Sequence, residues 1–277
     1  MSKVLDMFSL KNKVAVITGG AGLLGKKHAE ALAEFGCITI LADIDEKKGQ
    51  EAAEQIKNEF KVDSVFYKCD ITKKEEIVSL KNFIISTFGR IDILINNAAI
   101  DPKFDNSKSY TSFSRLEYFD VEQWNKELTV GLTGAFLCSQ IFGFEMAINK
   151  GGVIINISSD LGIISPDQRL YRKEGLPESQ QPVKPVTYSV IKHGLIGLTK
   201  YLATYWAEKG VRANTLCPAG VYTSQSGEFV KHISELIPMG RMAKIDEYKA
   251  AIVFLASDAS SYMNGATVVI DGGRSII

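Results

Sequence analysis

Thr18-Gly19-Gly20-Ala21-Gly22-Leu23-Leu24-Gly25 is the stretch of sequence that decides the fold. It follows a short apolar run rich in β-branched residues and opens a segment whose apolar residues recur at helical spacing. Glycines at such a junction allow a tight turn and let backbone N–H groups at the start of a helix approach a pyrophosphate. Any strand-to-helix turn favours glycine, so the stretch predicts a dinucleotide site only if strands and helices alternate around it.

Strand-like runs and helical segments do alternate along the whole chain. Most runs are apolar on both faces, as expected for parallel strands covered by helices on both sides. We therefore predict a single domain over residues 1–277, an α/β fold with a Rossmann-type, doubly wound, seven-stranded parallel sheet flanked by helices. The predicted strands are 14–18, 37–42, 64–67, 91–95, 152–157, 211–216 and 266–270, and the predicted helices lie near 24–35, 45–59, 73–88, 121–149, 187–209 and 246–256.

Two long connections, residues 100–120 and 163–187, interrupt this alternation. Each follows the carboxyl end of a predicted strand, where ligands bind in this architecture, so we predict extended active-site loops that meet over the substrate. Their aromatic and basic residues fit a sugar-like or anionic substrate; the alternative is local packing and exposure to solvent. The residues concerned are Phe104, Tyr110, Phe113, Tyr118, Phe119, Arg169, Tyr171, Arg172, Lys173 and Lys184.

The composition is that of an ordinary globular protein, with 277 residues of which 45% are hydrophobic. The 32 Lys and Arg residues balance the 32 Asp and Glu residues, so there is no electrostatic reason to expect a nucleic-acid or anionic-membrane partner. No apolar run approaches the roughly 18 residues that span a bilayer, and residues 1–13 lack the pattern of a secretion signal. Four cysteines without paired spacing predict core residues in a cytoplasmic protein, with no metal site.

A carboxylate at the end of the second predicted strand indicates which dinucleotide the glycine turn would bind. Asp43 lies 24 residues beyond Gly19 and is followed by Ile44. A carboxylate at this point accepts hydrogen bonds from a ribose 2′-hydroxyl and repels a 2′-phosphate, so we predict NAD rather than NADP. The alternative is that Asp43 caps the next helix, a role that Asp45 could also take.

Tyr188 and Lys192 offer chemistry for proton transfer. They are four residues apart and share one face of a predicted helix. A tyrosine titrates near pH ~10, and a nearby ammonium favours the phenolate, which brings the phenol toward useful acid–base catalysis. Ser159 follows the fifth predicted strand and could hold a substrate oxygen, although a serine at such a position is often only a turn former.

Together these residues resemble the short-chain dehydrogenase/reductase family, in its compact single-domain branch. The resemblance covers about Leu10 to Gly273, and it implies that Tyr188 donates or accepts the proton and that Ser159 orients the substrate oxygen. Lys192 would bind the nicotinamide ribose and lower the pKa of Tyr188. The other family markers are Cys69-Asp70-Ile71, Asn96-Asn97-Ala98-Ala99, Asn214, Pro218, Thr223 and Val269-Ile270-Asp271-Gly272-Gly273.

The resemblance also implies particular contacts with the cofactor. Asp70 and Ile71 would contact the adenine. Asn97 and Ala98 would flank the adenosine ribose. Val221 and Thr223 would hold the carboxamide. The complete predicted NAD site comprises Gly19, Gly22, Leu23, Leu24, Asp43, Ile44, Asp70, Ile71, Asn97, Ala98, Tyr188, Lys192, Pro218, Val221 and Thr223.

Four features depart from the compact branch. The glycine spacing is similar to that of the longer sugar-nucleotide branch, Gly131 replaces an Asn that distorts the helix in relatives, and Ala219 replaces a glycine after Pro218. Ser159 and Tyr188 are 29 residues apart, about twice the usual separation, because of the loop 163–187. The combination looks similar to bacterial flagellin-modification oxidoreductases, which are associated with surface-sugar synthesis.

The resulting prediction is an NAD(H)-dependent oxidoreductase that moves a hydride between the nicotinamide and a secondary alcohol or ketone, on a sugar or another small molecule. One alternative is a sugar-nucleotide dehydratase or epimerase, which the glycine spacing suggests. Another is a non-catalytic NAD-binding partner protein, which Gly131 favours slightly. Trp124 and Trp206 lie on helices that pack between subunits in relatives, so we expect a homodimer or homotetramer.

Overall fold

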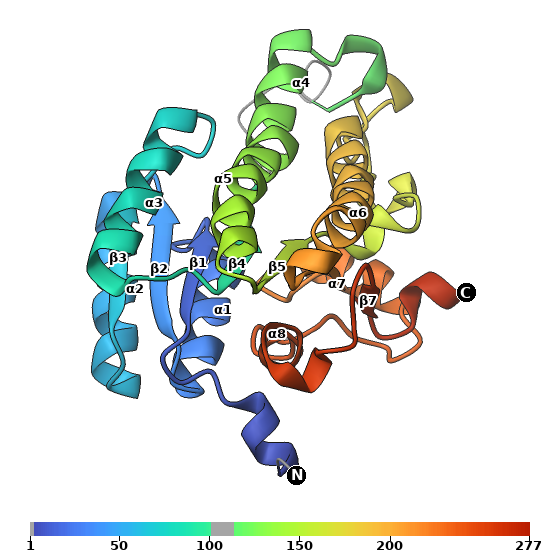
Figure 1. The fold of residues 1–277 in the computed structure, drawn as a ribbon. Helices are drawn as coiled ribbons and strands as arrows, with labels where there is room; N and C mark the ends of the chain where they lie inside the picture. Colours follow the sequence, from blue (N-terminus) through green and yellow to red (C-terminus); the bar gives the residue numbers. More distant parts are fainter. Residues whose placement is uncertain (1–2, 101–113) are drawn as a thin grey trace.

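Seven strands form one sheet in the order β3-β2-β1-β4-β5-β6-β7 in the computed structural model, which describes residues 3–100 and 114–277 (Figure 1). Every neighbouring pair is parallel. The chain order reverses between β1 and β4, which creates the switch point where this architecture binds ligands. The predicted Rossmann-type single domain is confirmed. The strands are β1 (Val14–Thr18), β2 (Ile38–Asp43), β3 (Ser64–Lys68), β4 (Ile93–Asn96), β5 (Gly152–Ile157), β6 (Val211–Pro218) and β7 (Thr267–Ile270).

The central strands β1 and β4 are buried throughout because helices cover both faces of the sheet. One hydrophobic core joins the sheet to α1 (Leu23–Glu34), α2 (Glu46–Phe60) and α8 (Lys249–Ala256). The other joins it to α3 (Lys74–Phe88), α5 (Gly134–Ile148) and α6 (Val186–Tyr205) (Figure 1). All four cysteines are buried free thiols, as the sequence predicts.

Several helices differ from the sequence prediction. The pattern predicts one helix over 121–149, but a π-helical turn, Thr129–Thr133, separates α4 (Val121–Leu128) from α5. α7 (Gly227–Glu235) is not predicted at all, because it is short and leaves most of its residues exposed. It begins where the Ser226 side chain accepts a hydrogen bond from the Phe229 N–H, which is a regular helix cap.

The stretch Val121–Ile148 is long and apolar enough to cross a membrane by length and composition, and it is the one such helix in the part of the chain that the structure describes. Half of its most apolar window is buried inside the protein, since α5 packs against β4 and β5. That burial is typical of a core helix in a globular protein.

The connection 163–187 contains two short 3-10 turns, Gln168–Tyr171 and Glu178–Gln180, of which the first lies beside α7. Leu170 is buried with Ile233, Ile237 and Met242 in a small apolar group, the α7 cluster, which is separate from the cores on the two faces of the sheet. Phe104, Tyr110 and Phe113 of the other predicted loop lie outside the described residues.

Candidate functional site

The glycine turn joins β1 to α1 at the switch point of the sheet. Gly19 has φ +63°, and a β-carbon there would lie 2.9 Å from the Cα of Ala98, so only glycine fits without a shift of the backbone. Gly22 is the N-cap of α1, whose first residues are Leu23 and Leu24, and it adds no side chain over the first turn of N–H groups. The turn therefore presents an uncovered, electropositive helix end of the kind that binds a pyrophosphate.

Asn97 and Ala98, which follow β4, hold this turn in shape. The Asn97 side-chain amide donates hydrogen bonds to the main-chain oxygens of Thr18 (3.0 Å) and Gly19 (3.1 Å). The backbone N–H groups of Asn97 and Ala98 both donate to Thr18 Oγ1, at 3.0 and 3.1 Å. The structure thus places Asn97 and Ala98 beside the glycine turn, and their contact with an adenosine ribose stays a prediction.

Asp43 lies at the carboxyl end of β2 and faces the same turn. Its Oδ2 accepts a hydrogen bond from the Ala21 N–H at 3.0 Å, and its Oδ1 accepts one from the Asp45 N–H at 3.0 Å. Asp45, not Asp43, caps α2, since its side chain accepts a hydrogen bond from the Lys48 N–H. The helix-cap alternative for Asp43 is therefore wrong. Ile44, beside it, has 68% of its surface exposed.

Asp70 and Ile71 follow β3 at the same edge of the sheet. The Asp70 carboxylate accepts hydrogen bonds from the N–H of Thr72 (3.0 Å) and from its hydroxyl (2.7 Å). The Ile71 side chain is buried against α5, where a β-carbon on Gly134 would lie 2.7 Å from Ile71 Cδ1. Both side chains are thus engaged within the protein, and their contact with an adenine stays a prediction.

Pro218 is the last residue of β6, and the segment after it carries Val221 and Thr223. Gln225 organises it: Gln225 Oε1 accepts a hydrogen bond from the Thr223 N–H (2.7 Å), and its amide donates to Val221 O (2.8 Å) and to Thr223 Oγ1 (3.1 Å). The sequence reasoning missed Gln225. A side-chain amide two residues after a predicted ligand is the signal that could have identified it.

Ser159, Tyr188 and Lys192 come together because α6 lies against the turn Asp160–Gly162 that follows β5. Lys192 is buried, and its Nζ donates a hydrogen bond to the main-chain oxygen of Ile157 at 2.8 Å. Ser158 Oγ donates to the main-chain oxygen of Lys192 at 2.7 Å, which joins the turn to the helix from the other side. The two candidate catalytic residues Ser159 and Lys192 are thus held on one buried frame.

A second ammonium approaches the candidate catalytic tyrosine. Lys184 Nζ lies 3.8 Å from the centre of the Tyr188 ring, and Lys192 Nζ lies 5.6 Å from it. Both ammonium groups therefore lie within cation–π distance of the Tyr188 ring. Lys184 appears in the sequence analysis only as a substrate-loop residue, although its spacing of four residues before Tyr188 is visible in the sequence.

A buried chain of polar side chains fixes the helices behind the site. The Asn96 amide donates to Asn156 Oδ1 (2.8 Å) and to Ser139 Oγ of α5 (3.0 Å). The Asn156 amide in turn donates to Thr199 Oγ1 of α6 at 2.7 Å, and Thr215 Oγ1 also donates to Thr199 Oγ1 at 2.7 Å. Asn96 Oδ1 has no hydrogen-bond partner among the described residues, but the other side-chain groups of this chain are paired, and paired groups of this kind favour one arrangement of the elements that they join. Sequence reasoning did not identify this chain.

Gly131 lies at the centre of the π-helical turn and is buried against α6. A β-carbon at Gly131 would lie 2.8 Å from Ile191 Cγ2. The family resemblance attributes the distortion of this helix to an Asn at this position. Here the helix is distorted although the residue is Gly131, and Ile191 fills the space next to it. π-helical turns occur frequently at functional sites.

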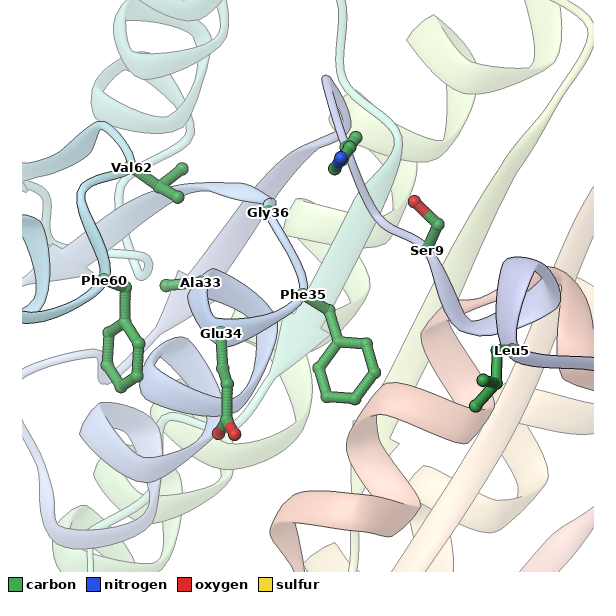
Figure 2. Close-up of a pocket in the computed structure, with 9 residues that line it drawn as sticks. Leu5, Ser9, Ala33, Glu34, Phe35, Gly36, Phe60 and Val62 are labelled. Atoms are coloured by element: carbon green, nitrogen blue, oxygen red, sulfur yellow. The ribbon is translucent and has the colours of Figure 1, made fainter.

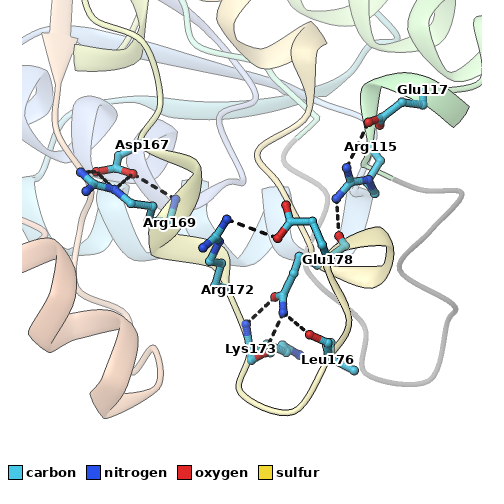
Figure 3. A network of polar contacts seen from close by, with 9 residues as sticks. Arg115, Glu117, Asp167, Arg169, Arg172, Lys173, Leu176 and Glu178 are labelled. Carbon is cyan, nitrogen blue, oxygen red and sulfur yellow. Dashed lines mark hydrogen bonds and ion pairs between the residues drawn. The ribbon is translucent and has the colours of Figure 1, made fainter.

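The two long connections do meet, within the described residues. Arg115 donates from Nη1 to the main-chain oxygen of Glu178 at 2.7 Å (Figure 3), and the Val183 N–H donates to Ser114 Oγ at 3.2 Å. The guanidinium groups of the second loop are engaged with its own carboxylates, as Figure 3 shows, since Arg169 Nη2 lies 2.7 Å from Asp167 Oδ2 and Arg172 Nη2 lies 3.3 Å from Glu178 Oε2.

A hollow of about 340 Å³ opens at the other edge of the sheet (Figure 2). It lies at the amino ends of β1, β2 and β3, away from the glycine turn and Ser159. The hollow is lined by Leu5, Ser9, Lys11, Ala33, Glu34, Phe35, Gly36, Phe60 and Val62.

Within residues 3–100 and 114–277, no group of three or more His, Cys, Asp or Glu side chains could hold a metal ion.

Comparison with known proteins identifies the family. Residues 13–171 match the short chain dehydrogenase family, and residues 178–275 match the family described as Enoyl-(Acyl carrier protein) reductase. D-threitol dehydrogenase of Mycolicibacterium smegmatis is 32% identical over 274 residues, covering 97% of this chain and 95% of that protein. NAD-dependent glycerol dehydrogenase of Listeria innocua is 31% identical over 274 residues, covering 97% and 96%.

Solved structures agree. A gluconate 5-dehydrogenase from Burkholderia cenocepacia, in complex with NADP and tartrate, superimposes with a TM-score of 0.85 at 27% identity, covering 99% of this chain and 100% of that one. The family matches, the relatives and the geometry lead to one conclusion. The chain belongs to the short-chain dehydrogenase/reductase family and is an oxidoreductase that acts on CH–OH or C=O groups.

Proposed function

We propose that this protein is an NAD(H)-dependent dehydrogenase of a small polyhydroxylated alcohol, with Tyr188, Lys192 and Ser159 as catalytic residues. The observation that carries the proposal is the buried frame at the end of β5, where Lys192 Nζ is fixed on Ile157 O beside Tyr188 and two residues before Ser159.

The residues at the switch point fit a dinucleotide. Gly19 and Gly22 leave space at the start of α1, and Asp43 places a carboxylate beside the turn. That carboxylate supports NAD over NADP, because it would accept hydrogen bonds from a ribose hydroxyl and repel a phosphate. When bound, the nicotinamide supplies the hydride acceptor or donor for the reaction.

The protein's own groups would handle the proton and the oxygen of the substrate. Tyr188 Oη would accept the hydroxyl proton when an alcohol is oxidised and return a proton to the oxygen when a ketone is reduced. The ammonium groups of Lys192 and Lys184, at 5.6 and 3.8 Å from the centre of the Tyr188 ring, would stabilise negative charge on the phenol oxygen during this transfer. Ser159 Oγ would hold the same substrate oxygen and thereby fix its orientation.

A neutral polyol is the substrate class that the structure supports best. Two of the relatives named above are dehydrogenases of the neutral polyols threitol and glycerol, and the third is a dehydrogenase of gluconate, a polyhydroxylated acid. Arg169 and Arg172, which the sequence suggested as anion receptors, pair with Asp167 and Glu178 of their own loop. A substrate of surface-sugar synthesis, as in the flagellin-modification enzymes, fits this class and belongs to the proposal as its more specific form.

The assembly and location of the protein are part of the same proposal. α5 and α6 expose apolar and aromatic side chains, which favours a homodimer or homotetramer through these helices. Four buried free thiols favour the reducing environment of the cytoplasm. The exposed side chains are Phe136, Phe144, Ile148, Tyr201 and Tyr205.

A substrate panel tests the function. Purified protein is mixed with NAD⁺ or NADP⁺ and with polyols, sugar acids and cyclic alcohols, and both NADH and the oxidised product are measured. We expect NADH to form in equal amount with the product of at least one polyol. Product without net NADH would instead identify a dehydratase or epimerase, and cofactor binding without turnover would identify a non-catalytic partner protein.

A further inference from the structure

A buried ion pair connects the turn after β5 to the segment after β7. Arg274 Nη1 lies 2.7 Å from Asp160 Oδ2, and the two side chains are only 6% and 3% exposed. The residues are 114 positions apart in the sequence. Buried charges of this kind contribute little net stability compared with apolar residues of similar size, so an ion pair beside a catalytic residue calls for a functional explanation.

The other oxygen of Asp160 binds the candidate catalytic serine. Ser159 Oγ donates a hydrogen bond to Asp160 Oδ1 at 2.7 Å, and the Leu161 N–H donates to the same oxygen at 2.8 Å. The Leu161 N–H also lies 3.2 Å from Ser159 Oγ, which accepts from it. One carboxylate therefore faces Ser159 with one oxygen and Arg274 with the other, and its orientation fixes that of the serine hydroxyl.

Arg274 itself is held rigidly. It begins the 3-10 turn Arg274–Ile276, and the Asp271 carboxylate accepts hydrogen bonds from the N–H groups of Gly273 (2.9 Å) and Ser275 (2.7 Å) on either side of it. Gly273 has φ +89°, and a β-carbon there would lie 3.0 Å from Pro238 Cγ. The backbone around Arg274 is thus fixed, and the side chain points into the protein toward Asp160.

We propose that Arg274 is a positioning residue for Ser159 and that it acts through Asp160. The inference rests on the proposed function, because it assigns Ser159 to the substrate oxygen. Without the guanidinium, Asp160 would be a buried, unpaired carboxylate, and it would turn away from Ser159 or take up a proton. Arg274 also neutralises Asp160, so that no uncompensated negative charge lies near a substrate oxygen on which negative charge develops.

Kinetics in two backgrounds distinguish a residue that positions Ser159 from one that only stabilises the fold. Arg274→Met and Arg274→Lys are made in the wild-type protein and in the Ser159→Ala variant, and turnover is measured with NAD⁺ and D-threitol, or the best polyol of the panel. In the wild-type background we expect Arg274→Met to lower kcat at least tenfold, with NADH affinity within twofold, and Arg274→Lys to recover part of the loss. In the Ser159→Ala background, Arg274→Met should lower kcat by less than twofold.

If Arg274→Met lowers kcat by the same factor in the two backgrounds, Arg274 only stabilises the fold, and the proposal is overturned. Arg241→Met is the matched control, because it removes an arginine–carboxylate pair with Glu247 (2.6 Å) that lies at the surface. If Arg274→Met does not fold, the double variant Asp160→Asn/Arg274→Met removes both charges together. It leaves no buried unpaired charge, and the same comparison of backgrounds applies.

A structural readout separates this inference from the proposed function. Crystal structures of the wild-type protein and the Arg274→Met variant, each with NADH, should show the Ser159–Asp160 hydrogen bond lost in the variant while the glycine turn is unchanged. An unchanged Ser159–Asp160 geometry would overturn the positioning role. Absence of turnover with every alcohol would overturn the proposed function, and the structural comparison would still decide the role of Arg274.

Discussion

Lys192 Nζ donates a hydrogen bond of 2.8 Å to the main-chain oxygen of Ile157, the last residue of β5. Because Ser159 follows two residues later, the same strand end fixes both the ammonium and the serine. The site is therefore built on the sheet and not on the long loops above it. Groups held by regular elements are placed more precisely than groups on loops, which suits a proton transfer that depends on short distances.

Tyr188→Phe should nearly abolish turnover and leave NADH binding close to that of the wild type. The change removes the phenolic hydroxyl and with it the transferable proton, while the ring and its two neighbouring ammonium groups stay. Steady-state kinetics with a panel substrate and calorimetry with NADH provide the measurement. Tyr201→Phe is the control, since Tyr201 is an exposed tyrosine of the same helix. Substantial activity in Tyr188→Phe would assign the proton transfer to another group.

Asp43 should determine the choice of cofactor. We expect the wild type to bind NAD(H) at least tenfold more tightly than NADP(H), a difference of about 1.4 kcal/mol, because the carboxylate repels a 2′-phosphate. Asp43→Ser should remove most of this preference, as calorimetry with both cofactors would show. Asp45→Asn alters the neighbouring helix cap and should keep the preference. Similar affinities of the wild type for the two cofactors would contradict the assignment.

Gly131→Ala should destabilise the protein although alanine is the better helix former by about 1 kcal/mol. The new β-carbon would lie 2.8 Å from Ile191 Cγ2, and overpacking of this kind costs roughly 1–3 kcal/mol. Urea unfolding measures the free energy. In the Ile191→Ala background the colliding methyl group is gone, so Gly131→Ala should be neutral or stabilising there. If Gly131→Ala lowers the free energy of unfolding by the same amount in both backgrounds, the π-helical turn itself requires glycine.

His28 should make the protein sensitive to mild acid. It is fully buried on α1, burial lowers its pKa to about 3, and neither ring nitrogen has a hydrogen-bond partner among the described residues. Since the folded pKa lies below the unfolded value of about 6.5, the unfolded state takes up the proton first. Stability is therefore complete above pH 6.5 and falls by about 1.4 kcal/mol for each further pH unit down to about pH 3.

The His28→Leu variant provides the measurement for this effect. Between pH 6.5 and 4.5 its free energy of unfolding should fall by about 2 kcal/mol less than that of the wild type. His193→Gln, a change at an exposed histidine of α6, should follow the wild-type curve. Parallel curves for His28→Leu and the wild type would show that His28 is not buried in its neutral form.

The sequence could predict what depends on local pattern. The apolar runs and the glycine turn predicted the sheet. The spacing of Asp43 from Gly19 predicted its position beside the glycine turn, and the spacing of Tyr188 and Lys192 predicted that they share one helix. It could not predict contacts between distant segments. Arg274 and Asp160 meet only because β5 and β7 end at the same edge of the sheet, and nothing near either residue indicates the other.

The interrupted helix shows the same limit. The period of apolar residues runs through 121–148 without a break, so only the packing of Gly131 against Ile191 reveals the extra residue in the turn. α7 was missed for a different reason. Its one buried residue, Ile233, packs with Leu170 of the loop 163–187 rather than in the two large cores, and a loop was not expected to offer a packing surface.

The α7 cluster of Leu170, Ile233, Ile237 and Met242 has a consequence for the timing of the reaction. Because it shares no residue with the two large cores, it can open by local unfolding while the sheet and the cofactor turn stay folded. Amide hydrogens of α7 should then exchange with solvent far sooner than those of β5. Opening of this kind occurs in microseconds to seconds, which is also the time range of the loop motions that limit turnover in many enzymes.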